Sequence, residues 1–167
     1  MPLKKQSLDP AAFNQSANLP FSLRLKDFEA AMQDVYDFFY DVNKLLLGKG
    51  LHRLDDMLRP AAMSGMLSDM LTASMAKHSR VLVENRHFNG HPDLVVQGRY
   101  ANNSTASGTD GVEIKSTRKK GGAVDTHGGR DQWMCVLEHF QEKWNPVFRS
   151  KMRQTLESWG TFSFHGN

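Results

Sequence analysis

The chain has 167 residues, of which 40% are hydrophobic and 23% are charged, and this suits one globular domain with one sizeable core. The formal net charge of +3 is too small to indicate a polyanionic partner by itself. A lone cysteine, Cys135, excludes an internal disulfide and a multi-cysteine zinc site, and favours a reducing compartment and a packed thiol. The sequence shows neither an apolar signal segment nor eighteen consecutive apolar residues, so we expect a soluble cytoplasmic protein with no membrane partner.

The amino-terminal half is predicted to be helical. Residues 1–20, with little periodicity, are expected to form a flexible arm, and residues 21–167 a single domain. From Asp27, a candidate N-cap, apolar residues recur at alternating steps of four and three, which is typical of an amphipathic helix ending at Gly48 and Gly50. That stripe comprises Phe28, Met32, Val35, Phe39, Val42 and Leu46.

Two further helical segments are expected before residue 80. A short one spans Leu51–Leu58, and Pro60 suits the first turn of a longer one that runs to about His78. Its buried stripe is rich in methionine, which is more typical of core packing than of an adaptable binding surface. The stripe consists of Met63, Met66, Leu67, Met70 and Leu71.

Residues 80–167 are predicted to hold a sheet and C-terminal helices. Short β-rich runs occur at 81–83, 93–96 and 111–115, separated by turn-forming residues. The polar stretch 102–110 contains no evident anchoring residue, so we expect a mobile connection between the second and third strands. The fold class is therefore mixed α/β, with a helical N-terminal half.

The C-terminal third is harder to assign. Residues Trp133 to Trp144 fit a helix, although Trp133, Cys135 and Leu137 also fit one face of a strand, and we favour the helix. A second helix is expected from Pro146 to Gly160, followed by a last strand over Thr161 to Phe164. The apolar residues of that second helix are Val147, Met152 and Leu156.

Chemistry is concentrated on two of the predicted strands. Glu113 and Lys115 lie two residues apart, so they share one face of a strand, and Asp93 opens the preceding strand. If these strands pair as a hairpin, the two carboxylates come within range of one ion. Hard oxygen ligands suit Mg²⁺, with Mn²⁺ as a substitute. Lys115 can then orient or help to deprotonate an attacking water.

Pro92-Asp93 and Glu113-Ile114-Lys115, set on two apolar strands, resemble the PD-(D/E)xK nuclease superfamily, which includes many type II restriction endonucleases. The resemblance covers about Val81 to Lys120 directly. It implies a restriction-endonuclease-like central mixed sheet flanked by helices, in which a helix and one or two strands follow the Glu-x-Lys strand. It also implies a Mg²⁺-dependent deoxyribonuclease in which Asp93, Glu113 and the Ile114 carbonyl bind the metal and Lys115 serves the nucleophile.

A basic, glycine-rich stretch leaves the Glu-x-Lys strand and is predicted to bind DNA phosphates, with an ordinary solvated loop as the alternative. Its candidate DNA-binding residues are Arg118, Lys119, Lys120, His127 and Arg130. Some members of the superfamily use a further acid, and Asp69 or Glu84 are the candidates here.

Two other functions stay open. One is a non-catalytic DNA-binding or assembly module in which Glu113 and Lys115 form an ordinary ion pair. Aromatic residues on several sides of the helix that starts at Asp27, including Phe38 and Tyr40, favour dimerisation, and a homodimer also suits an enzyme that cuts both strands of a symmetric site. The other is a resolvase or repair nuclease that recognises the shape of its DNA.

Overall fold

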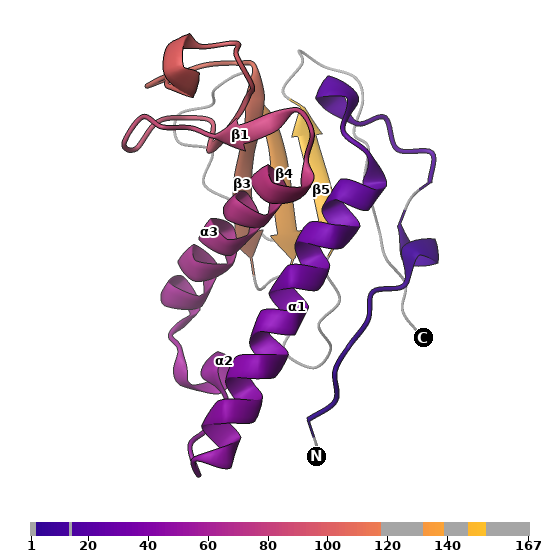
Figure 1. Cartoon of the computed structure of the whole chain (residues 1–167), viewed down its shortest axis with the longest axis vertical. Helices are drawn as coiled ribbons and strands as arrows, with labels where there is room; N and C mark the ends of the chain where they lie inside the picture. Colours follow the sequence, from indigo (N-terminus) through magenta and orange to yellow (C-terminus); the bar gives the residue numbers. More distant parts are fainter. Residues whose placement is uncertain (1–2, 14, 118–131, 139–146, 153–167) are drawn as a thin grey trace.

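A computed structural model describes residues 3–13, 15–117, 132–138 and 147–152. Helices lie against one face of a five-stranded mixed sheet with strand order β1-β2-β3-β4-β5, which confirms the mixed α/β class and the helical N-terminal half (Figure 1). The helices are α1 (Leu25–Gly48), α2 (Leu54–Met57) and α3 (Pro60–His78). The strands are β1 (Leu82–Glu84), β2 (Leu94–Val96), β3 (Gly111–Thr117), β4 (Trp133–Glu138) and β5 (Val147–Met152). Short 3-10 turns occupy Pro10–Ala12, Pro20–Ser22 and Ala101–Asn103.

Helix α1 follows the predicted apolar stripe, with Phe28, Met32, Val35 and Phe39 buried. The helix starts earlier than predicted, so Asp27 is its third residue and not its N-cap. From that position the Asp27 carboxylate accepts a hydrogen bond from the Arg24 backbone N–H at 2.9 Å and pairs with the Arg24 guanidinium. Asp27 therefore stabilises the helix start, as a carboxylate in the first turn does.

Helix α3 has the predicted bounds and packs against both α1 and the sheet. Its fully buried positions include Met63, Leu67 and Leu71, whereas Met66 and Met70 are only partly buried against the core. The methionine-rich stripe thus packs in the core, as predicted. Among the described residues, no helix is long and apolar enough to cross a membrane.

Asp34 of α1 ties that helix to the last turns of α3. Its Oδ2 accepts hydrogen bonds from Ser74 Oγ at 2.6 Å, Lys77 Nζ at 2.9 Å and His78 Nε2 at 2.8 Å. Partial burial acts to raise the pKa of Asp34, but these hydrogen bonds outweigh it and lower the pKa to about 2.

The segment before α1, which we expected to be a flexible arm, packs along that helix. The Phe13 side chain is buried in the core cluster. Gln33 of α1 accepts a hydrogen bond from the Leu8 backbone N–H at 3.1 Å and donates one to the Gln6 carbonyl at 3.1 Å. The segment is therefore anchored by an apolar side chain, although its sequence has little periodicity.

Three of the four strand pairs are antiparallel: β1 with β2, β2 with β3, and β4 with β5. The β2–β3 pairing confirms the hairpin predicted from the sequence. Strands β3 and β4 run parallel, and most of the connection between them, residues 118–131, falls outside the described part of the chain.

Strands β4 and β5 occupy residues that we predicted to be helical, so both helix predictions are wrong at 133–138 and 147–152. Strand β4 lies between two neighbours, and Met134, Cys135 and Val136 are all buried. A strand covered on both faces reads as a continuous apolar run, which periodicity alone does not separate from a helix. Positions 139–146 and 153–167, with Leu156 and the strand expected at Thr161 to Phe164, fall outside the described residues.

The connection 102–110, predicted to lack an anchor, is held at several points. The Asn85 side chain donates to the Thr105 carbonyl at 2.9 Å and accepts from the Thr105 backbone N–H at 3.0 Å. The Tyr100 hydroxyl accepts from the backbone N–H groups of Thr109 and Asp110 at 3.0 and 2.9 Å. These anchors lie before the loop in the chain, so the loop's own composition did not reveal them.

Candidate functional site

Strand β3 places Glu113 and Lys115 on the sheet face that points away from the helices. Val112 and Ile114 belong to the core cluster formed with α1 and α3, and Ser116 bonds Ser64 of α3 through their hydroxyls at 2.7 Å. Because side chains alternate along a strand, Glu113 and Lys115 occupy the opposite face. The predicted shared face of this pair is confirmed.

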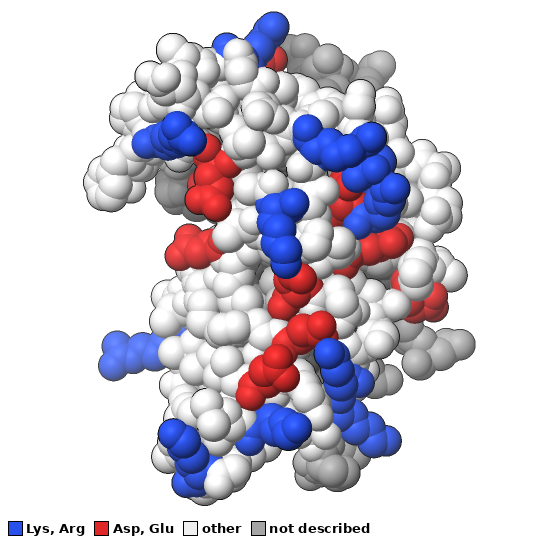
Figure 2. All heavy atoms as spheres, in the orientation of Figure 1, with Lys and Arg blue, Asp and Glu red and all other residues white. Residues whose placement is uncertain are grey.

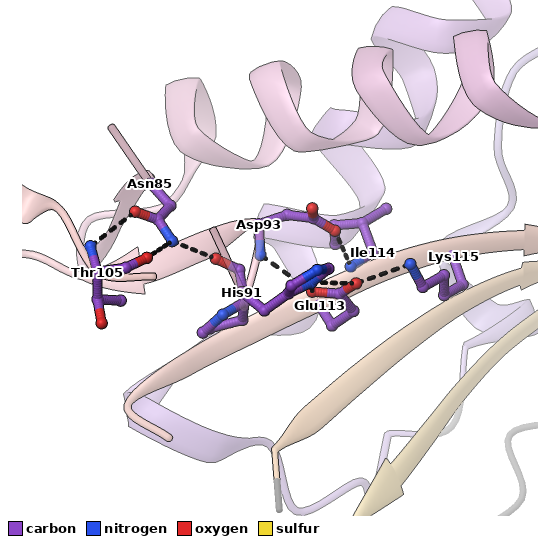
Figure 3. A network of polar contacts seen from close by, with 8 residues as sticks. Asn85, His91, Asp93, Thr105, Glu113, Ile114 and Lys115 are labelled. Atoms are coloured by element: carbon purple, nitrogen blue, oxygen red, sulfur yellow. Dashed lines mark hydrogen bonds and ion pairs between the residues drawn. The ribbon is translucent and has the colours of Figure 1, made fainter. Parts of the chain in front are cut away.

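Asp93 lies opposite Glu113. In the antiparallel β2–β3 pair Leu94 is the partner of Val112, and one step further along this register Asp93 faces Glu113. Two hydrogen bonds fix the pair: the Asp93 backbone N–H donates to Glu113 Oε2 at 3.2 Å, and Asp93 Oδ2 accepts from the Ile114 backbone N–H at 2.8 Å. The hairpin therefore brings the three residues of the motif together (Figure 3).

The Glu113 carboxylate is the centre of the site. Its side chain is only 1% exposed, and Lys115 Nζ lies 2.7 Å from Oε1 (Figure 3). His91 Nδ1 lies 3.1 Å from Oε1 and 3.2 Å from Oε2. A carboxylate buried this deeply is costly unless it is paired and hydrogen-bonded, and these contacts satisfy that requirement.

Asp93 is half-buried beside this first carboxylate. Burial, and then repulsion by the Glu113 charge, raise the pKa of Asp93, while the Ile114 N–H and the Lys115 charge act in the opposite direction. Two acidic groups close together in a partly desolvated place resist ionising together. The same arrangement favours a bound cation, which lets both ionise.

Asp93 and Glu113 supply two of the ligands that a hard divalent cation needs. Asp93, directly before β2, and Glu113 of β3 supply the carboxylate oxygens that Mg²⁺ prefers, and Mg²⁺ usually keeps several waters beside one or two carboxylates. Within the described residues, no group of three or more His, Cys, Asp or Glu side chains converges to hold a metal ion. A cation here would therefore depend on two carboxylates, the backbone and water.

His91 and Asn85 are site residues that sequence reasoning missed. Asn85 Nδ2 donates to the Pro92 carbonyl at 3.0 Å, so it holds the residue directly before Asp93 (Figure 3). His91 stands two positions before Asp93, outside the regular β2–β3 ladder, and its backbone forms an isolated bridge with Ser107. The available signal was the His-Pro-Asp run itself, which places an imidazole two residues before Asp93.

Strand β4 supplies the neighbouring wall of the site. It is paired with β3 so that Met134 lies beside Glu113 and Val136 beside Lys115. Both side chains are buried and apolar. Gln132, directly before the strand, is also buried, and its Oε1 accepts no hydrogen bond from any described residue.

The two candidate extra acids lie elsewhere. Glu84 is exposed. Because side chains alternate along a strand, Glu84 lies on the same face of β1 as Leu82, which packs into the helical core. Asp69 is exposed on α3, the helix that packs on the core side of β3. In the described part of the chain, neither residue forms a hydrogen bond with Asp93 or Glu113.

The predicted DNA-binding residues Arg118, Lys119, Lys120, His127 and Arg130 fall outside the described residues. On the face formed by the helices, the basic and acidic side chains are interspersed (Figure 2). That face therefore does not offer the continuous basic surface that typically binds a phosphate backbone.

Comparison of the chain with protein-family models, curated proteins and solved structures found no match in any of the three. The likeness to the PD-(D/E)xK superfamily consequently rests on the motif residues and on their arrangement.

Proposed function

We propose that this chain is a metal-dependent endonuclease that hydrolyses DNA phosphodiester bonds and belongs to the restriction-endonuclease-like group. One observation carries the proposal: Asp93, directly before β2, lies opposite Glu113 of β3, with the Lys115 ammonium 2.7 Å from Glu113 Oε1. Residues distant in sequence thus form an acid, acid and lysine set that could support metal-dependent phosphodiester hydrolysis.

Mg²⁺, with Mn²⁺ as a substitute, fits the residues present. Asp93, Glu113 and the Ile114 carbonyl would hold it, and water would complete its shell. When bound, the ion stabilises negative charge on the phosphate and lowers the pKa of a bound water. The raised pKa of Asp93 supports the assignment, because a cation between the carboxylates removes the repulsion that contributes to the shift.

Lys115 serves the nucleophile. Its Nζ is held in place by Glu113, and its side chain is 21% exposed, so the ammonium lies between the buried Glu113 carboxylate and the solvent. From there Nζ can orient an attacking water or accept its proton, and the apolar Met134 and Val136 beside it limit competing water. His91 keeps the Glu113 carboxylate in position.

The strand order also supports the proposal. The resemblance implies one or two strands after the Glu-x-Lys strand, and β4 and β5 stand in that place. DNA binding is assigned to the basic residues at 118–130, which directly follow the strand that carries Glu113 and Lys115. A homodimer fits exposed apolar side chains on α1, including Phe38 and Leu45.

Lys115→Ala tests the assignment. We expect this variant to bind DNA and Mn²⁺ but to lose plasmid cleavage, because Nζ is needed for the nucleophile and is not a metal ligand. Glu84→Ala, which removes an exposed charge on the other side of the sheet, should cleave as the wild type does. Equal cleavage by wild type and Lys115→Ala would contradict the proposed role.

A second candidate is a non-catalytic DNA-binding module. It is favoured by the Glu113 carboxylate, which is already satisfied by Lys115, His91 and the Asp93 backbone N–H and so forms a self-contained network. For such a module, neither Mg²⁺ nor Lys115→Ala should change the state of plasmid DNA.

A further inference from the structure

Gln132 lies on the same sheet face as the proposed cation site. In the parallel β3–β4 pair Val112 is beside Trp133, and Glu113 is beside Met134. Trp133 packs against the helical core, so Gln132 and Met134, one position to either side, belong to the opposite face. Gln132 is therefore a diagonal neighbour of Glu113, with about 8 Å between their Cα atoms from standard strand spacings.

The Gln132 amide is buried without a matching donor. The residue is 7% exposed, and its Oε1 is buried and accepts no hydrogen bond from the part of the chain that the structure describes. A buried acceptor without a donor destabilises a fold, so native proteins rarely keep one without a purpose. On this face Met134 and Val136 have no donor to offer, and Lys115 Nζ contacts Glu113.

The missing donor should belong to whatever occupies the site beside Glu113. A phosphodiester has no proton to donate, whereas water bound to a divalent cation is a strong donor and Mg²⁺ retains several such waters. The diagonal offset from Glu113 suits a contact through one water and not a direct bond to the ion.

We propose that Gln132 is a further residue of the cation site, and that its Oε1 accepts a hydrogen bond from a water in the hydration shell of the divalent ion held by Asp93 and Glu113. This inference rests on the proposed function. It adds a positioning residue from the segment directly before β4 to a set that otherwise comes from the β2–β3 hairpin.

Mn²⁺ titration of the full chain, followed by the electron paramagnetic resonance signal of free Mn²⁺, tests the assignment. Gln132→Met keeps the length of the side chain and removes the acceptor, and we expect about 10-fold weaker Mn²⁺ binding. Gln132→Glu retains an acceptor and should restore the affinity. Gln97→Met, at an exposed glutamine beyond β2, is the matched control and should bind Mn²⁺ as the wild type does.

Thermal unfolding in EDTA provides the second readout. Because Gln132→Met removes an unsatisfied buried acceptor, its melting temperature without metal should equal or exceed that of the wild type. A lower melting temperature with unchanged Mn²⁺ affinity would assign Gln132 a purely structural role and overturn the inference.

The two proposals fail in different ways. If the wild type binds Mn²⁺ and Glu113→Gln abolishes binding, while Gln132→Met binds as tightly as the wild type, only the role of Gln132 is overturned. If the wild type binds no Mn²⁺, the proposed cation site fails, and the Gln132 inference fails with it.

Discussion

Replacing Glu113 by glutamine keeps the shape of the buried side chain and removes its charge. The native carboxylate forms an ion pair with Lys115 Nζ at 2.7 Å, and it accepts hydrogen bonds from His91 Nδ1 at 3.1 Å and from the Asp93 backbone N–H at 3.2 Å. Hydrogen bonds to a charged group contribute about 1.5–3 kcal/mol each, but the glutamine oxygen still accepts one of them. The mutation also removes the desolvation cost of the charge and its repulsion with Asp93.

We therefore expect Glu113→Gln to lower the free energy of unfolding by about 1–3 kcal/mol in EDTA, measured by urea denaturation. Its effect on cleavage should be much larger, because one of two carboxylate ligands is lost. Even outer partners of metal ligands contribute 10- to 100-fold, so we expect plasmid cleavage in Mg²⁺ to fall by at least about 100-fold.

Glu84→Gln is the matched control, since it makes the same chemical change at an exposed glutamate on the helical side of β1. It should leave both stability and cleavage near wild-type values. Cleavage by Glu113→Gln at the wild-type rate, or an equal loss in Glu84→Gln, would refute the assignment of the metal to Glu113.

Three further outcomes follow from the structure. Burial raises the pKa of Asp93, so the stability that its proton contributes is present below the ordinary carboxyl pKa and is lost as pH rises through the raised value. The melting-temperature increase on adding Mg²⁺ should therefore grow as pH rises above the ordinary carboxyl pKa. The pKa of Asp34 is lowered to about 2, and its side chain is 37% exposed. Asp34→Asn should therefore lower the free energy of unfolding by only about 1 kcal/mol at neutral pH. Urea denaturation should show this difference disappearing as pH falls from 3.8 toward 2. A Cβ at Gly111 would collide with the Leu94 carbonyl oxygen, so Gly111→Ala should lower the free energy of unfolding by about 3 kcal/mol. Gly65 lies on α3 with open space around it, so Gly65→Ala should leave the free energy of unfolding unchanged or raise it by up to about 1 kcal/mol.

The helices and the hairpin were predictable because their signals are local. Pro60 sets the first turn of α3, and a regular apolar stripe marks α1. The alternation around Glu113 and Lys115 fixes their shared face, and two successive β-rich runs joined by a polar connection favour a hairpin. These local rules therefore sufficed for the three residues of the motif.

Strands β4 and β5 were not predictable in the same way. A helix and a two-sided buried strand both produce the apolar run from Trp133 to Leu137, and only pairing with β3 decides between them. Gln132 depends on that pairing, since its place near Glu113 follows from a parallel register between segments that are distant in the chain. The position of His91 depends on the segment before β2, where its backbone bridges Ser107 of the connection between β2 and β3.

The most direct test of the central proposal is an incubation of the full chain with plasmid, single-stranded and branched DNA, in Mg²⁺ and in Mg²⁺ with excess EDTA. We expect cleavage of at least one substrate in Mg²⁺, abolished by EDTA and by Glu113→Gln, and mapped ends then separate a restriction-like enzyme from a structure-specific one. Intact DNA on all three substrates in Mg²⁺ and in Mn²⁺ would contradict the proposal that Asp93, Glu113 and Lys115 form a nuclease site.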